Sequence, residues 1–529
     1  MKTDVKHIKN LVATNSRPGV ASDLKFVYRN LFEKQLLNDF KSNINFADHE
    51  AMAWLKSNRT YIDAPTDKGL GCAVLLRTKY DSLASQCLEK SYRNVDNLFV
   101  FDTILKIKND TREAIDFALC HDILHEKQRE YITCLLDNLP IYPKGRLLIK
   151  VHKQVTGARL IASGTRWITN PHALVLAKYL QPVVAAETTV ARDTQDVIKA
   201  LESCTFSSTS KAATFDVEQL YPSMEPARVK GAVKVALLAY YTLNPCRGYG
   251  ALIEFLVWLL QIIFDGQILR MTSAVSGTKS LFVQVVGITT GLSCAVQLAN
   301  LFLLGMDQTF KHTFSVQLHL YKRFVDDVLV VMGENCNTQD MLNSLNAFDD
   351  LIVCTNDGAE SDTKVTFLDL DIDFSMGALT YSTHRKPLAT YGYTPADSCH
   401  SKQTLLGIVS TEAIRLLRTN SSMSSFTYHC AFFASKLKLR GYDLLEVRRI
   451  LAKYPWHRRS ELIVPVKRVK KQVVALKLPF SPNAIQIKAA SIFRSYEHLL
   501  PGRIRATFRP LVAWETSPNL FRIRYSRFC

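Results

Sequence analysis

The segment from Tyr321 to Val331 limits the possible folds of this chain more than any other. Its sequence, YKRFVDDVLVV, places two adjacent carboxylates, Asp326 and Asp327, between apolar, β-favouring runs. Such a pattern predicts a strand, a tight acidic turn and a second strand. Two aspartates at a hairpin tip repel each other, and a divalent cation would relieve that repulsion; carboxylates without Cys or His suit Mg²⁺. The alternative is an ordinary hairpin, because Asp is a common turn residue.

Size and charge set the class of protein. The chain has 529 residues, which predicts two to four domains or subdomains, and 47% of them are hydrophobic, as in globular proteins. The formal net charge is +18 and the pI about 9.3. A basic excess of this size indicates a polyanionic partner, most often nucleic acid. By charge alone, a ribosomal-type binder or a membrane-surface protein would look the same.

The twelve cysteines are scattered, with neither a Cys-x-x-Cys pair nor zinc-type spacing. This pattern favours reduced thiols in an intracellular protein. The first residues lack the apolar core of a signal peptide. The most apolar segment, 251–264, is too short to span a bilayer and contains Glu254 and Gln261. We therefore expect a buried helix there and no membrane partner.

Local patterns predict a mixed set of elements. Helices are expected at 23–40, over most of 77–137, at 170–184, from about 226 towards 269, at 292–304 and over much of 400–475. Strands are expected at 72–76 after a glycine turn at 65–71, in a basic hairpin of 146–153 and 159–163, at 214–217, and in a pair formed by 365–373 and 379–384. The segment from Gly287 to Gly291 is expected to be a turn.

The stretch from about 436 to 471 is rich in basic residues. Its cations are Lys436, Lys438, Arg440, Arg448, Arg449, Lys453, Arg458, Arg459, Lys467, Arg468, Lys470 and Lys471. Tyr442, Tyr454 and Trp456 lie among them, as in surfaces that bind nucleic acid by charge and stacking. The alternative is a solvated helical face. The run 467–471 could equally be a nuclear import signal or a nucleic-acid contact.

Nucleotidyl transfer by two metal ions needs carboxylates from at least two strand ends. Asp216 lies near the end of one expected strand, and Asp326 and Asp327 cap the hairpin. Taken alone, Asp216 could simply terminate a strand.

The order of these segments resembles reverse transcriptases, and among them the Penelope-like retroelement group. Residues 215–224 (FDVEQLYPSM), 284–303 (QVVGITTGLSCAVQLANLFL) and 324–328 (FVDDV) resemble the family's motifs A, B and C. Upstream, 67–71, 148–153 and 159–163 are similar to the Asp-Lys-x-x-Gly, Leu-Pro-Lys-x-His-Lys and Arg-Pro-Ile-x-Ser signatures. Downstream, 367–370, 385–387 and 398–402 resemble further family signatures. The resemblance extends from about residue 60 to the end.

The resemblance implies an α+β, right-hand polymerase fold. The expected parts are an N-terminal helical extension (1–60), fingers (61–205), a palm with an antiparallel sheet (206–385, with 225–285 partly a fingers insert), and a thumb with a basic C-terminal region (386–529). Many members carry a C-terminal GIY-YIG nuclease. Neither of its signatures occurs here, so we expect a member without the nuclease or a truncated copy.

The resemblance also implies residue roles. Asp216, Asp326 and Asp327 would be catalytic and would bind two Mg²⁺ ions, or Mn²⁺, with the Val217 carbonyl as a further metal ligand. Asp216 and Asp326 would be the principal ligands.

Other residues would bind the nucleotide. Lys150, Lys153 and Arg159 would approach the triphosphate, unless they only form a basic hairpin. Tyr221 would exclude a 2′-hydroxyl, unless it is a tyrosine at the edge of the core. The motif B turn would be shaped by Gln284, Gly287 and Gly291, and Lys364 would be a possible general acid for pyrophosphate.

Several prolines of the family pattern are absent. Thr289 and Thr290 replace Pro-Met in motif B, and Val296, Leu160 and Ile149 replace other prolines. Losing proline loosens a turn but removes no reacting group. We therefore expect these changes to affect template positioning more than chemistry.

The sequence thus predicts an RNA-directed DNA polymerase of a retrotransposon that extends a DNA primer or RNA–DNA hybrid on an RNA template with dNTPs, inside the cell and in the nucleus. The alternative is a decayed or host-adopted reverse transcriptase that binds RNA without polymerising. Family B DNA polymerases are a poorer match, because their Asp-Thr-Asp motif is absent.

Overall fold

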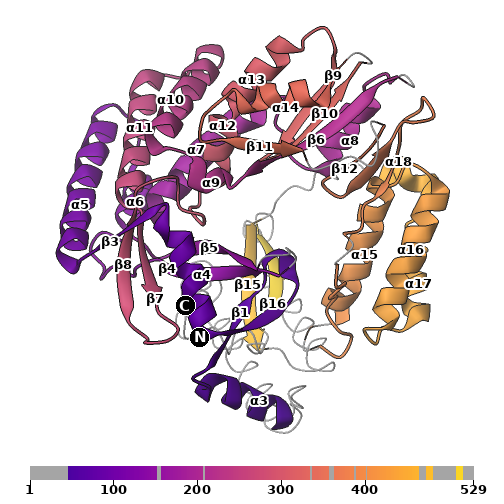
Figure 1. Cartoon of the computed structure of the whole chain (residues 1–529), viewed down its shortest axis with the longest axis horizontal. Coiled ribbons are helices and arrows are strands. Elements are labelled where there is room, and N and C mark those ends of the chain that lie inside the picture. The colour runs from indigo at the N-terminus through magenta and orange to yellow at the C-terminus, as the bar shows by residue number, and fades with distance from the viewer. Residues whose placement is uncertain are drawn as a thin grey trace, which may run out of the picture. The chain divides into compact units, whose positions relative to one another are not determined.

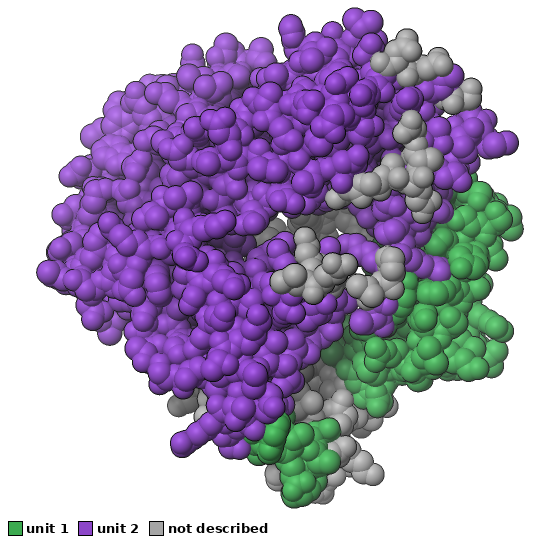
Figure 2. Space-filling view, in the orientation of Figure 1, with its two compact units in different colours: residues 1–54, 391–529 green, residues 55–390 purple. Residues whose placement is uncertain are grey.

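The computed structural model describes residues 46–151, 156–206, 209–333, 336–356, 363–386, 389–398, 400, 402–463, 472–479 and 508–515. The chain divides into two compact units, coloured separately in Figure 2. One unit comprises residues 55–390, and the other comprises 1–54 with 391–529. Helix α3 (Phe46–Ser57) crosses the first boundary. The helix expected at 23–40 lies outside the described residues.

A four-stranded antiparallel sheet, here called the acidic sheet, belongs to the 55–390 unit (Figure 1). Its strand order is β11 (Val353–Asn356), β6 (Lys211–Glu218), β10 (Asp327–Met332) and β9 (Leu318–Phe324). The hairpin predicted around Asp326 and Asp327 is confirmed as β9 and β10. The strand predicted at 214–217 is confirmed as part of β6, which pairs with β10.

Both faces of the acidic sheet are buried, which explains why β10 is an unbroken apolar run. Val328 and Val330 pack into a core with helices, whereas Leu329 and Val331 pack into a second core on the opposite face. The helical core draws on α5 (Asn97–Cys120), α7 (Asn170–Ala186), α10 (Pro226–Leu243), α11 (Tyr249–Asp265), α12 (Ala295–Phe302) and α13 (Leu304–Thr313). The second core includes α8 (Thr194–Glu202) and a small antiparallel sheet of β12 (Lys364–Phe367), β13 (Leu370–Asp373) and β14 (Thr380–Thr383).

A second large sheet has five strands in the order β3 (Tyr92–Val95), β8 (Lys279–Gln284), β7 (Ile268–Thr272), β4 (Lys144–Lys150) and β5 (Gly157–Ser163). The predicted basic hairpin is confirmed as β4 and β5. The predicted strand at 72–76 is β2 (Cys72–Leu76), which pairs with β1 (Tyr61–Pro65). The turn between them contains η1 (Asp67–Gly69), and Thr66 bridges to Ile149 of β4.

The remaining helices of this unit are α4 (Arg77–Glu89), α6 (Glu126–Thr133), α9 (Leu220–Ser223) and α14 (Thr338–Asn346). The buried helix predicted at 251–264 is confirmed within α11, where nine apolar side chains are buried. In the part of the chain that the structure describes, no helix is both long and apolar enough to cross a membrane.

The other unit contains α15 (Lys402–Arg418), α16 (Met423–Lys438), α17 (Leu444–Leu451), η2 (Trp456–Arg458) and α18 (Arg459–Leu462), which share one apolar core. Two further strands, β15 (Gln472–Pro479) and β16 (Phe508–Glu515), pair in parallel. The predicted helical stretch of 400–475 is therefore correct only as far as Leu462, since residues from Gln472 are extended. Lys467, Arg468, Lys470 and Lys471 lie outside the described residues.

Two predictions of local structure were wrong. Residues 365–373 form two strands, because Leu368 adopts a left-handed conformation (φ +56°) that turns the chain back on itself. The helix expected at 292–304 begins only at Ala295 and ends at Phe302, and α13 follows. Apolar pattern alone marks neither break.

Candidate functional site

Asp216 and Asp327 lie directly opposite each other on neighbouring strands. The antiparallel register of β6 and β10 pairs Asp216 with Asp327 and Phe215 with Val328. Residues directly opposite in an antiparallel pair project from the same face, with Cβ atoms roughly 5 Å apart. The two carboxylates therefore share one face of the acidic sheet, while Phe215 and Val217 point into the helical core.

Asp326 lies in the turn between β9 and β10. Its carbonyl oxygen accepts a hydrogen bond from the Val217 amide at 3.0 Å, which fixes the turn against β6. Val325, the preceding residue, has φ +58°. A β-branched residue in the left-handed region is strained, and such strain persists only where the surroundings enforce it. The register therefore brings Asp216 and Asp327 together, and the enforced turn places the backbone of Asp326 next to them; all three aspartates are half-buried.

Tyr221 lies beside this turn. It belongs to α9, directly after Gln219, which has φ +48°. Burial raises the pKa of Tyr221; the negative charge of Asp326 raises it further, and the positive charge of Arg159 opposes the rise. The phenol is therefore close enough to interact electrostatically with both Asp326 and Arg159. The structure brings Tyr221, Asp326 and Arg159 into one neighbourhood, although Arg159 comes from the five-stranded sheet.

The predicted turn at Gly287–Gly291 packs against α9 and β5. A Cβ on Gly287 would lie 2.3 Å from the Pro222 carbonyl oxygen, and one on Gly291 would lie 2.3 Å from the Ala162 carbonyl oxygen. The Ile288 amide donates to the Tyr221 carbonyl (2.9 Å), and the Ala162 amide donates to the Thr290 carbonyl (3.0 Å). The turn therefore packs backbone to backbone on α9 and on the edge strand β5, and only glycine fits at its two ends.

Thr289 stabilises this turn through hydrogen bonds, at the position where a proline was expected. Its hydroxyl lies 2.7 Å from Oε1 of Gln284 and 3.0 Å from Oε1 of Gln267, and its amide donates to the same Gln267 oxygen at 2.6 Å. The Gln284 amide group donates to the Val286 carbonyl. Hydrogen bonds between buried polar side chains therefore stabilise this turn. The expectation that it would be looser without a proline was wrong.

The basic hairpin presents Lys150 and Arg159 on one face, because Lys150 lies opposite Gly157 and Arg159 lies opposite Leu148. Arg159 pairs with the buried Asp67 at 3.6 Å, and this contact ties the 65–71 turn to β5. Lys153 lies outside the described residues.

A cavity of about 560 Å³ opens beside Asp327. Thr214 and Asp327 line it from the acidic sheet, Thr366 lines it from β12, and its basic lining residues are Lys68, Arg192, His384 and Lys386. Asp193 and Asp369 also line the cavity. None of these residues was predicted to belong to the site. Lys68 carried a signal in the sequence, because it lies within the Asp-Lys-x-x-Gly turn; in the structure its φ is +59°.

Lys364, the expected general acid, forms an ion pair with Asp373, its cross-strand neighbour, at 3.0 Å. Burial acts to raise the pKa of Asp373, but hydrogen bonds from Ser375 and the Lys364 ammonium group outweigh it, so the pKa is lowered. On β12, Lys364 shares a face with Thr366, which lines the cavity, but Lys364 is not itself among the lining residues. No contact described for this part of the chain joins it to the three aspartates.

The donor set fits Mg²⁺ by its chemistry. Among the described residues, no three His, Cys, Asp or Glu side chains form a cluster that would hold a metal ion. The register nevertheless places two carboxylates, those of Asp216 and Asp327, on one face. Mg²⁺ typically takes one or two protein carboxylates and completes its shell with water and substrate phosphates. Such a site can bind a cation together with a phosphorylated substrate.

Comparisons with known proteins found distant likenesses only. No family model and no curated protein matches the sequence. Among solved structures, telomerase from Candida albicans in complex with a fragment of telomeric RNA has 11% identity and a TM-score of 0.46, covering 83% of this chain and 75% of that chain. Apo telomerase from Candida tropicalis, truncated from its C-terminal domain, has 12% identity and a TM-score of 0.38, covering 62% of this chain and 66% of that chain.

The RNA-dependent RNA polymerase of BmCPV has 11% identity and a TM-score of 0.37, covering 72% of this chain and 35% of that chain. The chain thus spans about two thirds of the truncated Candida tropicalis telomerase chain and about a third of the viral polymerase. These scores are too low to establish a shared fold. What is established is a mixed α and β chain whose acidic sheet presents Asp216 and Asp327 together, with Asp327 lining a cavity that has both basic and acidic walls.

Proposed function

We propose that this protein is an RNA-directed DNA polymerase, a reverse transcriptase of the Penelope-like type. The observation that carries the proposal is the pairing of Asp216 with Asp327 on one face of the acidic sheet, with Asp326 in the adjoining turn. Segments far apart in the sequence meet there, and nucleotidyl transfer by two metal ions needs carboxylates from at least two such segments. Lys68, Arg192 and Lys386 in the lining of the adjacent cavity are cations that could pair with substrate phosphates.

In this proposal, Asp216, Asp326 and Asp327 would hold two Mg²⁺ ions, with the Val217 carbonyl as a further ligand. When bound, these ions would lower the pKa of a primer 3′-hydroxyl and stabilise the charge on the leaving pyrophosphate. The protein's own contribution is to place the carboxylates, which it does through the β6–β10 register and the Val217–Asp326 hydrogen bond.

The nucleotide would be oriented by residues around this centre. Arg159 and Lys150, with Lys153, would bind the triphosphate from the hairpin as charge-assisted donors. Tyr221 would lie under the sugar and exclude a 2′-hydroxyl, while the turn at Gly287–Gly291, fastened by Gln284, would support the templating base. Lys364 would protonate the pyrophosphate only if it left its ion pair with Asp373.

The test is primer extension on an RNA template with dNTPs and Mg²⁺ or Mn²⁺. Wild-type protein should extend the primer, and Asp327→Asn should abolish extension while RNA affinity stays unchanged. Asp102→Asn is a charge-matched control, since Asp102 is an exposed residue of α5. Failure of purified, folded wild-type protein to extend any primer, with RNA binding intact, would refute the polymerase and favour an RNA-binding protein without catalysis.

A further inference from the structure

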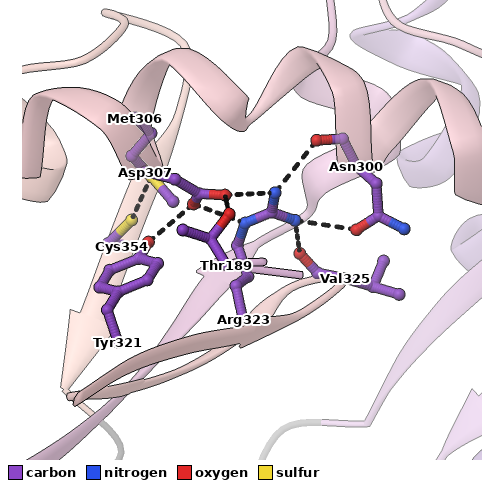
Figure 3. Close-up of polar contacts among 8 residues, drawn as sticks. All are labelled: Thr189, Asn300, Met306, Asp307, Tyr321, Arg323, Val325 and Cys354. Carbon is purple, nitrogen blue, oxygen red and sulfur yellow. Dashed lines mark hydrogen bonds and ion pairs between the residues drawn. The ribbon is translucent and has the colours of Figure 1, made fainter. Parts of the chain in front are cut away.

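A buried ion pair lies directly behind the turn that carries Asp326. The Arg323 side chain is 0% exposed and that of Asp307 is 1% exposed. The guanidinium binds the carboxylate in a bidentate fashion: Nε donates to Oδ1 and Nη2 donates to Oδ2, both at 2.8 Å (Figure 3). Arg323 belongs to β9, and Asp307 belongs to α13.

The remaining donors of Arg323 are also satisfied. Nη2 donates to the Asn300 carbonyl at 3.0 Å, and Nη1 donates to the Asn300 side-chain oxygen at 2.9 Å and to the Val325 carbonyl at 3.0 Å. A guanidinium has five N–H groups in a rigid plane, and each of them has an acceptor here. The last of these bonds reaches the backbone of the turn itself.

The other side of the pair is equally complete. The Asp307 carboxylate accepts hydrogen bonds from the Tyr321 hydroxyl at 2.8 Å and the Thr189 hydroxyl at 3.1 Å. Burial, and then the negative charge of Asp307, raise the pKa of Tyr321, so this phenol remains a donor. The backbone of Arg323 is held too: its amide donates to the Thr189 carbonyl, and its carbonyl accepts from the Ala191 amide.

Stability alone does not account for such a network, because a buried ion pair is often no better than apolar side chains of the same volume. Its placement points to a different role. Val325 is held in the left-handed region, which a valine avoids, and its carbonyl is an acceptor of Arg323. Asp326 is the next residue in the chain.

We propose that Arg323 is a positioning residue. By holding the Val325 carbonyl, braced by Asp307 and Asn300, it keeps the strained turn in the conformation that aims Asp326 and Asp327 at the metal site. This role rests on the proposed function, because it assigns the turn to metal binding and catalysis.

The test compares Arg323→Lys with wild type. Lysine keeps the charge, but its single ammonium cannot reach five acceptors spread over three residues. Two quantities are measured on folded protein: the affinity for Mn²⁺ by electron paramagnetic resonance, with Asp326→Asn defining the signal of this site, and primer extension. We expect Arg323→Lys to weaken Mn²⁺ binding and to lower kcat, each by roughly 10- to 100-fold, with KM for dNTP little changed.

Rescue separates positioning from folding. Asparagine tolerates the left-handed region far better than valine does, so Val325→Asn in the Arg323→Lys background should recover most of the lost Mn²⁺ affinity and kcat. It restores no partner to Asp307, so a merely structural defect would not be rescued. Should Arg323→Lys fail to fold, the variant Arg323→Met/Asp307→Leu/Tyr321→Phe removes both charges and should fold, with the same loss of Mn²⁺ affinity and the same rescue by Val325→Asn.

The possible outcomes are distinct. The positioning role would be overturned if Arg323→Lys kept its Mn²⁺ affinity and kcat within twofold of wild type. It would also be overturned if Val325→Asn did not rescue Arg323→Lys. Wild-type protein that binds Mn²⁺ no better than Asp326→Asn would overturn it as well. Wild-type protein that binds Mn²⁺ through Asp326 yet extends no primer would refute the polymerase and leave the positioning role standing.

Discussion

The amide of Val217 donates a hydrogen bond to the carbonyl of Asp326 at 3.0 Å, although 109 positions separate the two residues in the sequence. This bond extends the β6–β10 ladder by one step into the turn. The bond fixes the position of the turn along β6, next to Asp216. The distance between the carboxylates therefore depends on how β6 and β10 pair.

Neutralising Asp216 should stabilise the metal-free protein. Asp216 lies directly opposite Asp327, and like charges so placed destabilise a sheet by up to about 1 kcal/mol. Asp216→Asn should therefore unfold at a higher temperature than wild type in EDTA. With Mg²⁺ present, the wild type should gain stability and the variant should gain less. A lower unfolding temperature for the variant in EDTA would show that the two carboxylates do not repel.

Alanine at Gly287 should disrupt the site through a clash with the backbone. A Cβ there would lie 2.3 Å from the Pro222 carbonyl oxygen, at φ +78°. Gly277 is a matched control, since its φ of +74° carries the same backbone strain while a Cβ would meet nothing within 4 Å. Gly277→Ala should cost about 1–3 kcal/mol from strain alone. Gly287→Ala should cost more and should abolish extension; equal losses in the free energy of unfolding would contradict the packing described for this turn.

Removing the Tyr221 ring should relax sugar selection. The phenol lies near Asp326 and Arg159, and the proposed function places the nucleotide sugar against it. Tyr221→Ala should raise the ratio of kcat/KM for a ribonucleotide to that for the deoxyribonucleotide by roughly 10- to 100-fold. Tyr221→Phe keeps the ring and should keep the selection. If both variants retain wild-type selection, Tyr221 does not contact the sugar.

His172 should make stability depend on pH. It is fully buried, and burial lowers its pKa from 6.5 to about 4. Between these values the unfolded chain binds a proton that the folded protein does not, so stability is complete above about pH 6.5 and falls as the pH drops towards 4, by up to about 3 kcal/mol.

His172→Gln should remove this part of the pH dependence. Glutamine stays neutral and can still reach the Thr111 hydroxyl, which lies 2.9 Å from Nε2 of His172. The measurement is denaturant unfolding of both proteins at pH 4.5 and pH 7. Parallel losses in the two proteins would show that His172 is not the group that titrates.

Local patterns predicted the elements that carry the site. The strands around Asp216 and Asp327, the β4–β5 hairpin and the glycine turn were expected from apolar runs and turn residues, and the structure confirms them. The break at Leu368 was missed, because a leucine with positive φ is enforced by its neighbours and leaves no mark in the sequence. Threonine in place of proline at 289 predicts a looser turn, whereas hydrogen bonds of Thr289 to Gln284 and Gln267 hold this turn in the structure.

By itself, the sequence determined which residues could do the chemistry: an acidic hairpin tip, a third aspartate in a β-run and a basic excess. Hydrophobic periodicity and turn preference act over a few residues, so they can be recognised in the sequence. Tertiary structure alone decided that Asp216 faces Asp327, that Lys68 lines the cavity beside Asp327, and that Arg323 reaches the Val325 carbonyl. Those relations depend on strand register and on burial of charges between elements, which are settled only when distant segments pack.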